Sequence, residues 1–178
     1  MKILNKIMNR LNLKRFSAGI WAAMGIQAIR ITGMSISFSY LSLYLHRQRH
    51  LEMTLVGLII LISGLISGGF SLVGGALADR FGHRRIFIIF QITETAMFAL
   101  MALLMGINAP VLVICGTSLL VSMAGGMAAP AISALVTDAA QNKNLAESYG
   151  MMAIGGNLGW AIGPLTGGLL HNKPARFG

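Results

Sequence analysis

Hydrophobic residues in this chain fall into five long blocks that short polar segments separate. The pattern predicts helical spans at about residues 16–45, 53–77, 86–105, 111–136 and 149–170. Each block reaches the roughly 20 residues that a helix needs to cross the hydrocarbon core of a bilayer. Backbone groups in lipid must be satisfied within the segment, and these blocks do not alternate like barrel strands, so the sequence predicts an all-α integral membrane protein. Because the connections are short, we expect consecutive helices to be antiparallel neighbours.

Polar segments flank this predicted bundle, which covers residues 16–170. Residues 1–15 combine basic side chains with apolar residues at helical spacing, including Ile3, Ile7 and Leu11. We expect this lead-in to lie on the cytoplasmic leaflet as an amphipathic helix, the alternative being a frayed basic segment that only sets the topology. Residues 171–178 form a short polar tail with no sixth span.

Composition agrees with this assignment. Hydrophobic residues make up 55% of the 178 residues and charged residues 11%, far below the quarter or so that is usual in soluble domains. The formal net charge of +9 does not indicate nucleic-acid binding, because the basic residues lie at the ends of the spans. The single cysteine, Cys115, lies inside a span and forms no internal disulfide.

Basic residues also predict the orientation of the chain, because cytoplasmic loops of membrane proteins are enriched in Lys and Arg. On the side of the N-terminus the sequence places Lys2, Lys6, Arg10, Lys14, Arg15, Arg80, Arg84, Arg85 and Lys143. On the other side it places Arg47, Arg49, Lys173 and Arg176. Nine against four predicts a cytoplasmic N-terminus.

Glycines mark the faces on which these helices are expected to pack. In lipid, helices associate through close contact, so small residues indicate contact faces. The second span contains Gly64 and Gly68, followed by Gly69, Gly74 and Gly75, and the fourth contains Gly125 and Gly126 just before Pro130. The fifth span has a continuous stripe at every fourth position, formed by Gly155, Gly159, Gly163 and Gly167. Pro164 lies in the same helix and is expected to bend it. Such a bent glycine face suits either a moving interface or plain bundle packing.

Polar residues inside a span are costly, so each is a candidate for function. The candidates are Arg30 and Gln27 in the first span, Glu94 in the third and Asn157 in the fifth. Arg30 either lines a central cavity, pairs with Glu94, or extends towards the cytoplasmic headgroups. Glu94 is either a protonatable group or a buried structural residue that stays neutral and hydrogen-bonded.

Other chemistry has little support in the sequence. His46 and His50 have the spacing of metal ligands on one helical face, but they lie in a charged turn where solvated side chains are the simpler interpretation. The sequence has no phosphate-binding glycine loop, zinc-ligand spacing or nucleophile–base constellation. We therefore expect neither an enzyme nor a bound metal or cofactor.

The turn between the second and third spans has a distinctive sequence. Gly82 permits a tight reversal, Asp79 can accept charge-assisted hydrogen bonds, and the arginines hold the turn in the cytoplasm. The segment resembles motif A of the major facilitator superfamily of secondary transporters at Gly75, Asp79, Arg80, Gly82, Arg84 and Arg85. His83 occupies a position that is more often Arg in that family.

A second resemblance lies in the fifth span. Gly150, Gly159, Gly163, Pro164, Gly167 and Gly168 resemble motif C of the drug–proton antiporters of the superfamily. Asp138, at the cytoplasmic end of the fourth span, also fits the family pattern. One departure is that the fourth span has no basic residue, whereas family antiporters carry an Arg near the position of Val121 or Ser122. The other is length, because the family has twelve spans in two six-helix halves.

The resemblance implies that this chain supplies five helices of a six-helix N-terminal bundle. It implies a secondary transporter that exports small amphipathic compounds in exchange for protons. Its partners would then be a small-molecule substrate, protons, the lipid bilayer, and the missing C-terminal half or another membrane subunit. Two alternatives remain: an uptake permease for sugars or other nutrients, and a non-transporting membrane subunit that docks through its glycine faces.

Overall fold

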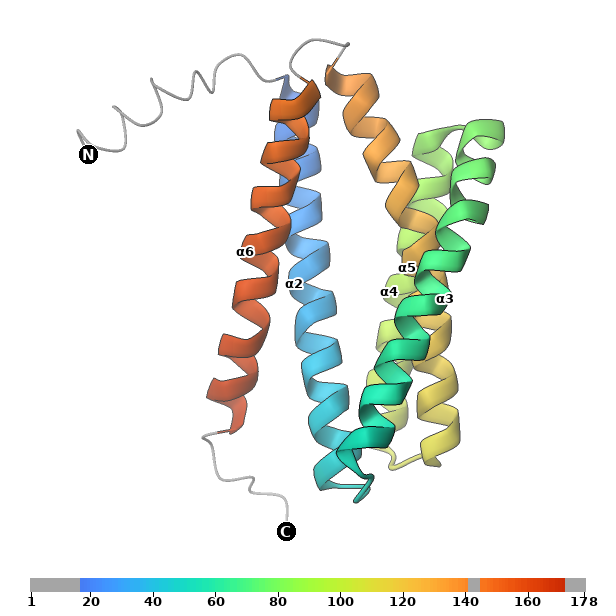
Figure 1. The fold of residues 1–178 in the computed structure, drawn as a ribbon, viewed down its shortest axis with the longest axis vertical. Coiled ribbons are helices and arrows are strands. Elements are labelled where there is room, and N and C mark those ends of the chain that lie inside the picture. The colour runs from blue at the N-terminus through green and yellow to red at the C-terminus, as the bar shows by residue number, and fades with distance from the viewer. Residues whose placement is uncertain (1–16, 141–144, 172–178) are drawn as a thin grey trace, which may run out of the picture.

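The computed structural model describes residues 17–140 and 145–171, and its elements in these ranges are all α-helices. They are α2 (Ala18–Arg47), α3 (Met53–Phe81), α4 (His83–Gly106), α5 (Val111–Ala140) and α6 (Leu145–His171) (Figure 1). The five helices confirm the five predicted blocks, with no boundary differing by more than four residues. The lead-in of residues 1–15, the tail after 171, and the side chains of residues 163, 164 and 166–171 lie outside the described structure.

Three of the described helices, α3, α4 and α5, are long and apolar enough to cross a membrane. The other two are of similar length, at 30 residues for α2 and 27 for α6. Over the described residues, α2 and α6 are not among the helices that meet this criterion. That α2 and α6 also cross the bilayer therefore stays a prediction.

The helices associate in two groups. α2 packs mainly against α6, and α5 packs against both α3 and α4 (Figure 1). The expectation that consecutive helices are neighbours is right for α4 and α5. It is wrong for α2 and α3, which have few contacts, and it misses the two large contacts of α2 with α6 and of α3 with α5.

Glycines explain this arrangement. A Cβ atom added to Gly159 of α6 would lie 2.8 Å from the backbone nitrogen of Thr32 in α2, and one added to Gly155 would lie 2.6 Å from the carbonyl oxygen of Met24. In the other group, Gly74 of α3 lies against the backbone of α5. Small residues let helix backbones approach closely, so the positions of a few glycines decide which helices pair.

Not every glycine expected to mark a contact face does so. A Cβ atom added to Gly64 or Gly68 of α3 would meet no neighbour within 4 Å among the described residues. These two positions therefore form no helix contact among the described residues. Contact of α3 with α5 depends on two other glycines that the sequence also indicated: Gly74, and Gly126 of α5, which lies against the backbone of Ser67.

The turn between α3 and α4 is much shorter than the basic segment suggested. α3 continues to Phe81 and α4 begins at His83, so only Gly82 breaks the helical path. Gly82 has a φ of 95°, in the region that favours glycine because it lacks a Cβ atom. The expected tight reversal at Gly82 is confirmed, but Gly75, Asp79 and Arg80 belong to α3 and not to a loop.

We predict that Gly159→Ala destabilises the chain by about 1–3 kcal/mol, because the added methyl group would press on the backbone of α2. Thermal unfolding in detergent, followed by circular dichroism, measures this loss. Gly57→Ala is the matched control, since that position faces open space and alanine favours a helix by up to about 1 kcal/mol. Equal melting temperatures for the two variants would contradict close packing of α2 on α6.

Candidate functional site

A cavity of about 460 Å³ lies among the five helices. One part of its lining is apolar and aromatic, formed by Met34, Phe38, Ile60, Val121 and Trp160. Another part consists of serine hydroxyls and glycine backbone, contributed by Ser39, Ser42, Ser63, Ser67, Ser122, Gly64 and Gly125. Two charged side chains complete it, Arg30 and Glu94. A largely apolar pocket with a few convergent polar groups is the usual form of a small-molecule site.

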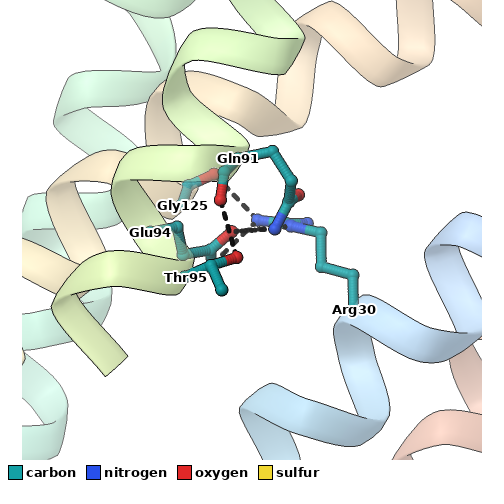
Figure 2. Close-up of polar contacts among 5 residues, drawn as sticks. All are labelled: Arg30, Gln91, Glu94, Thr95 and Gly125. Carbon is teal, nitrogen blue, oxygen red and sulfur yellow. Dashed lines mark hydrogen bonds and ion pairs between the residues drawn. The ribbon is translucent and has the colours of Figure 1, made fainter. Parts of the chain in front are cut away.

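Arg30 and Glu94 form a buried ion pair at this cavity. Nε of Arg30 lies 3.1 Å from Oε2 of Glu94, and Nη2 lies 3.4 Å from Oε1. The same Nη2 donates a hydrogen bond of 2.9 Å to the carbonyl oxygen of Gly125 in α5. Only 9% of the Arg30 side chain and 3% of the Glu94 side chain are exposed. Arg30 thus reaches from α2 to both α4 and α5 (Figure 2).

Glu94 has a second polar neighbour on its own helix. Nε2 of Gln91 donates a hydrogen bond of 3.2 Å to Oε2 of Glu94, and the hydroxyl of Thr95 donates one of 2.8 Å to the Gln91 carbonyl oxygen. Removing one partner of a buried charge pair costs much more than the pair contributes, because the other charge is left in a low dielectric. The network therefore holds Glu94 in one position.

The structure decides between the alternatives for Arg30. Its side chain both lines the cavity and pairs with Glu94, and it does not extend towards the headgroups. The sequence reasoning did not single out Ser63, Ser67 or Ser122 as cavity residues. Their only signal was a hydroxyl inside an apolar span, which many helices carry by hydrogen bonding back to their own backbone.

The other two polar candidates do not line the cavity. Asn157 is exposed on α6, although the nearby Trp160 is a lining residue. Gln27 is half-buried beside α6, where a Cβ added to Gly156 would lie 4.0 Å from its Cγ. The Oε1 atom of Gln27 is buried and has no hydrogen-bond partner among the described residues.

A second polar cluster joins the ends of α3, α4 and α5. Nδ1 of His83 lies 2.9 Å from Oδ2 of Asp138, and Nε2 lies 3.5 Å from Oδ1 of Asp79. A neutral imidazole donates from one nitrogen only, so both contacts are donated together by the protonated ring. Asp79 and Asp138 are largely exposed, and exposed pairs contribute at most about 1 kcal/mol each. The cluster therefore positions the ends of the helices more than it stabilises the fold.

Comparison with known proteins identifies the family. The model of the Major Facilitator Superfamily matches residues 23–174, which is most of the chain. The chain belongs to the major facilitator superfamily. Such proteins are transporters and not enzymes.

Relatives within the superfamily are distant. A Na(+), Li(+), K(+)/H(+) antiporter of Planococcus maritimus is 29% identical over 143 residues, which cover 78% of this chain and 32% of the antiporter. Quinolone resistance protein NorA of Staphylococcus aureus strain MRSA252 is 30% identical over 130 residues, which cover 68% of this chain and 31% of NorA. The uncharacterized MFS-type transporter YdeE of Escherichia coli K12 is 27% identical over 164 residues, which cover 90% of this chain and 39% of YdeE. The chain spans about a third of the length of these relatives, and no solved structure matches it.

The superfamily motifs expected from the sequence lie in different surroundings. In the motif A segment, Arg84 and Arg85 are exposed, and the guanidinium of Arg80 lies 5.3 Å from the centre of the Phe81 ring. His83 makes the ionic contacts described above, and Gly75 lies near Pro130 of α5.

In the motif C segment, Gly159 packs against α2, whereas a Cβ atom added to Gly150 would meet no neighbour within 4 Å among the described residues. The surroundings of four motif C residues lie outside the described structure: Gly163, Pro164, Gly167 and Gly168.

The two histidines considered as metal ligands make no joint site in the described ranges. Nδ1 of His46 lies 2.9 Å from the carbonyl oxygen of Leu51, and His50 has a φ of 55° in the turn after α2. Among the described residues there is no group of three His, Cys, Asp or Glu side chains able to hold a metal ion.

We predict that Arg30→Met destabilises the chain by about 3–5 kcal/mol, because it leaves the Glu94 carboxylate buried without its cation. Unfolding of the purified protein in detergent measures the loss. The double variant Arg30→Met, Glu94→Gln removes both charges and should recover most of it. Losses from Arg30→Met and Glu94→Gln that simply add in the double variant would contradict a direct ion pair.

Proposed function

We propose that this chain forms part of the substrate pathway of a transporter that exports small amphipathic compounds in exchange for protons. The observation that carries the proposal is the cavity of about 460 Å³ with an ion pair inside it. Charged residues within membrane helices are expensive, and they mark the paths of substrates and ions. The apolar and aromatic lining suits the hydrophobic part of an amphipathic compound.

Relatives of this chain support the direction and the coupling. One is named as a Na(+), Li(+), K(+)/H(+) antiporter and another as a quinolone resistance protein, and these names connect relatives of this chain with exchange for protons and with resistance to a drug. Alternating access needs two halves that rock about a site near the midplane. We therefore propose that the chain acts with the remaining helices of such a transporter, or with another membrane subunit.

Arg30 brings a positive charge to the fourth span, which has no basic residue of its own. α5 has no Lys or Arg within Val111–Ala140. The guanidinium of Arg30 nevertheless reaches the α5 backbone at Gly125 and the carboxylate of Glu94. We propose that Arg30, from α2, supplies the positive charge that other antiporters of the family place on the fourth helix.

The proposed placement in the membrane follows the basic residues. All five helices would cross the cytoplasmic membrane of a prokaryote as part of a six-helix bundle, with the N-terminus in the cytoplasm. The start of α2, the turn at Gly82, the end of α5 and the start of α6 lie at the same end of the bundle (Figure 1). Arg80, Arg84 and Arg85 belong to that end, and the cluster of Asp79, His83 and Asp138 ties its helices together.

We predict that cells expressing this chain in its full reading frame export an amphipathic fluorescent dye, and that a protonophore abolishes the export. Glu94→Gln should reduce export at least about tenfold, because it removes the carboxylate of the cavity. Gly57→Ala, which faces open space, serves as the control that keeps wild-type export. Export that ignores the proton gradient would exclude antiport, and accumulation of a labelled nutrient inside the cells would favour an uptake permease.

We predict that the turn at Gly82 is cytoplasmic. In a Cys115→Ser background, Arg84→Cys should react with a membrane-impermeant maleimide only after the cells are opened. His50→Cys should react in intact cells, because it lies at the opposite end of the bundle. The reverse pattern of labelling would show the opposite orientation.

A further inference from the structure

We infer that the Glu94 carboxylate and the Gly125 carbonyl oxygen form a cation site in the cavity, and that Arg30 is its resident occupant. When Arg30 withdraws, the site takes a monovalent organic cation with an apolar body. The inference rests on the proposed function, because it specifies the substrate class of the same cavity.

The atoms around the Arg30 guanidinium carry the inference. Oε1 and Oε2 of Glu94 and the carbonyl oxygen of Gly125 lie 2.9–3.4 Å from its nitrogens. Nε2 of Gln91 donates a hydrogen bond to Glu94. Oε1 of Gln91 is buried and has no partner among the described residues. The fixed wall therefore presents oxygen acceptors, and a cation is the ligand that such a wall binds.

The carboxylate is the fixed member of the pair. Glu94 is 2% exposed, and its short side chain lies in space that exists because Gly125 has no Cβ. A Cβ atom at Gly125 would lie 2.5 Å from Oε1 of Glu94 and 3.3 Å from Nη2 of Arg30. Any side chain at this position would therefore move the carboxylate.

Arg30 is the member that can leave. It extends from α2, which belongs to the helix group of α6, to α4 and α5 in the other group (Figure 2). Its long flexible stem allows the guanidinium to withdraw into the cavity that it lines, whereas the short Glu94 side chain has no such freedom.

The rest of the cavity indicates what kind of cation replaces Arg30. Phe38 and Trp160 offer aromatic faces that attract cations, and Met34 and Val121 offer apolar surface. The Ser63 hydroxyl lines the cavity and is buried with no partner among the described residues. An anion would have to reach Arg30 beside the fixed Glu94 carboxylate, and that like-charge contact disfavours it.

Binding to the 178-residue chain in lipid nanodiscs tests the inference. The probes are tetraphenylphosphonium, a cation, and triphenylphosphine oxide, a neutral molecule of similar shape, measured by equilibrium dialysis against empty nanodiscs. The buffer is held at about pH 8, well above the ordinary carboxyl range. In wild type the cation should bind more tightly than the neutral probe.

Two variants should move the affinity for the cation in opposite directions. Arg30→Gln removes the competing occupant and should tighten cation binding about tenfold or more, the size of one charge-assisted hydrogen bond. Glu94→Gln keeps an amide in place and should weaken cation binding by a similar factor. Neither variant should change binding of the neutral probe by more than about twofold, within ordinary context dependence.

The double variant Arg30→Gln, Glu94→Gln guards against a single variant that fails to fold, because it leaves no unpaired charge. It should lose the tightened cation affinity of Arg30→Gln and keep at most the small preference for the cation that the aromatic rings give. Unchanged cation affinity in Glu94→Gln, or a double variant that binds the cation as tightly as Arg30→Gln does, would overturn the inference. So would an anionic probe, tetraphenylborate, that binds more tightly than the cation and loses its affinity in Arg30→Gln.

Binding and transport separate this inference from the proposed function. A protein that shows the cation selectivity but exports nothing fails the proposed function alone. A protein that exports in a proton-dependent way but binds both probes equally in all variants fails the inference alone.

Discussion

Helices in a bilayer gain little from burying apolar side chains, so they associate where small residues let their backbones touch. In this chain the touching points are few. Gly155 and Gly159 bring α6 against α2, and Gly74 and Gly126 bring α3 against α5. These contacts set the two helix groups, and the cavity lies where the groups face each other without such glycine contacts. The position of the cavity is thus a consequence of where the backbones meet.

A buried charge pair would be costly in such a place unless both charges were fully satisfied. Here Arg30 donates to Glu94 and to the Gly125 carbonyl oxygen, and Gln91 donates to Glu94 as well. Gly125 contributes twice, through its carbonyl oxygen and through the side chain that it lacks. The pair also crosses from one helix group to the other, so its state and the contact between the groups depend on each other.

The polar contacts at the end of the bundle near Gly82 are exposed, in contrast to the buried ion pair. His83, Asp79 and Asp138 are exposed to differing degrees, so their contacts contribute little energy, but they connect three helices at one point. The glycine contacts join helix backbones directly, whereas the links at the helix ends run through exposed side chains. The chain thus combines close backbone contacts with weak polar links.

The sequence by itself determined the five helices and the tight turn at Gly82, because hydrophobic length and a required positive φ are local properties. Two patterns, motif A and motif C, were enough to indicate the family that the comparison then showed. Only the tertiary structure decided which helices pair, since Gly64, Gly68 and Gly74 are equally candidate contact positions in the sequence, yet Gly74 touches α5 whereas the other two face open space. It also decided that Arg30 meets Glu94, 64 residues away, and that Asn157 stays outside the cavity. The physical reason is that a sequence shows which residues a helix carries, whereas the rotation of each helix about its axis, which directs side chains to a neighbour, to the cavity or to lipid, depends on all of its partners at once.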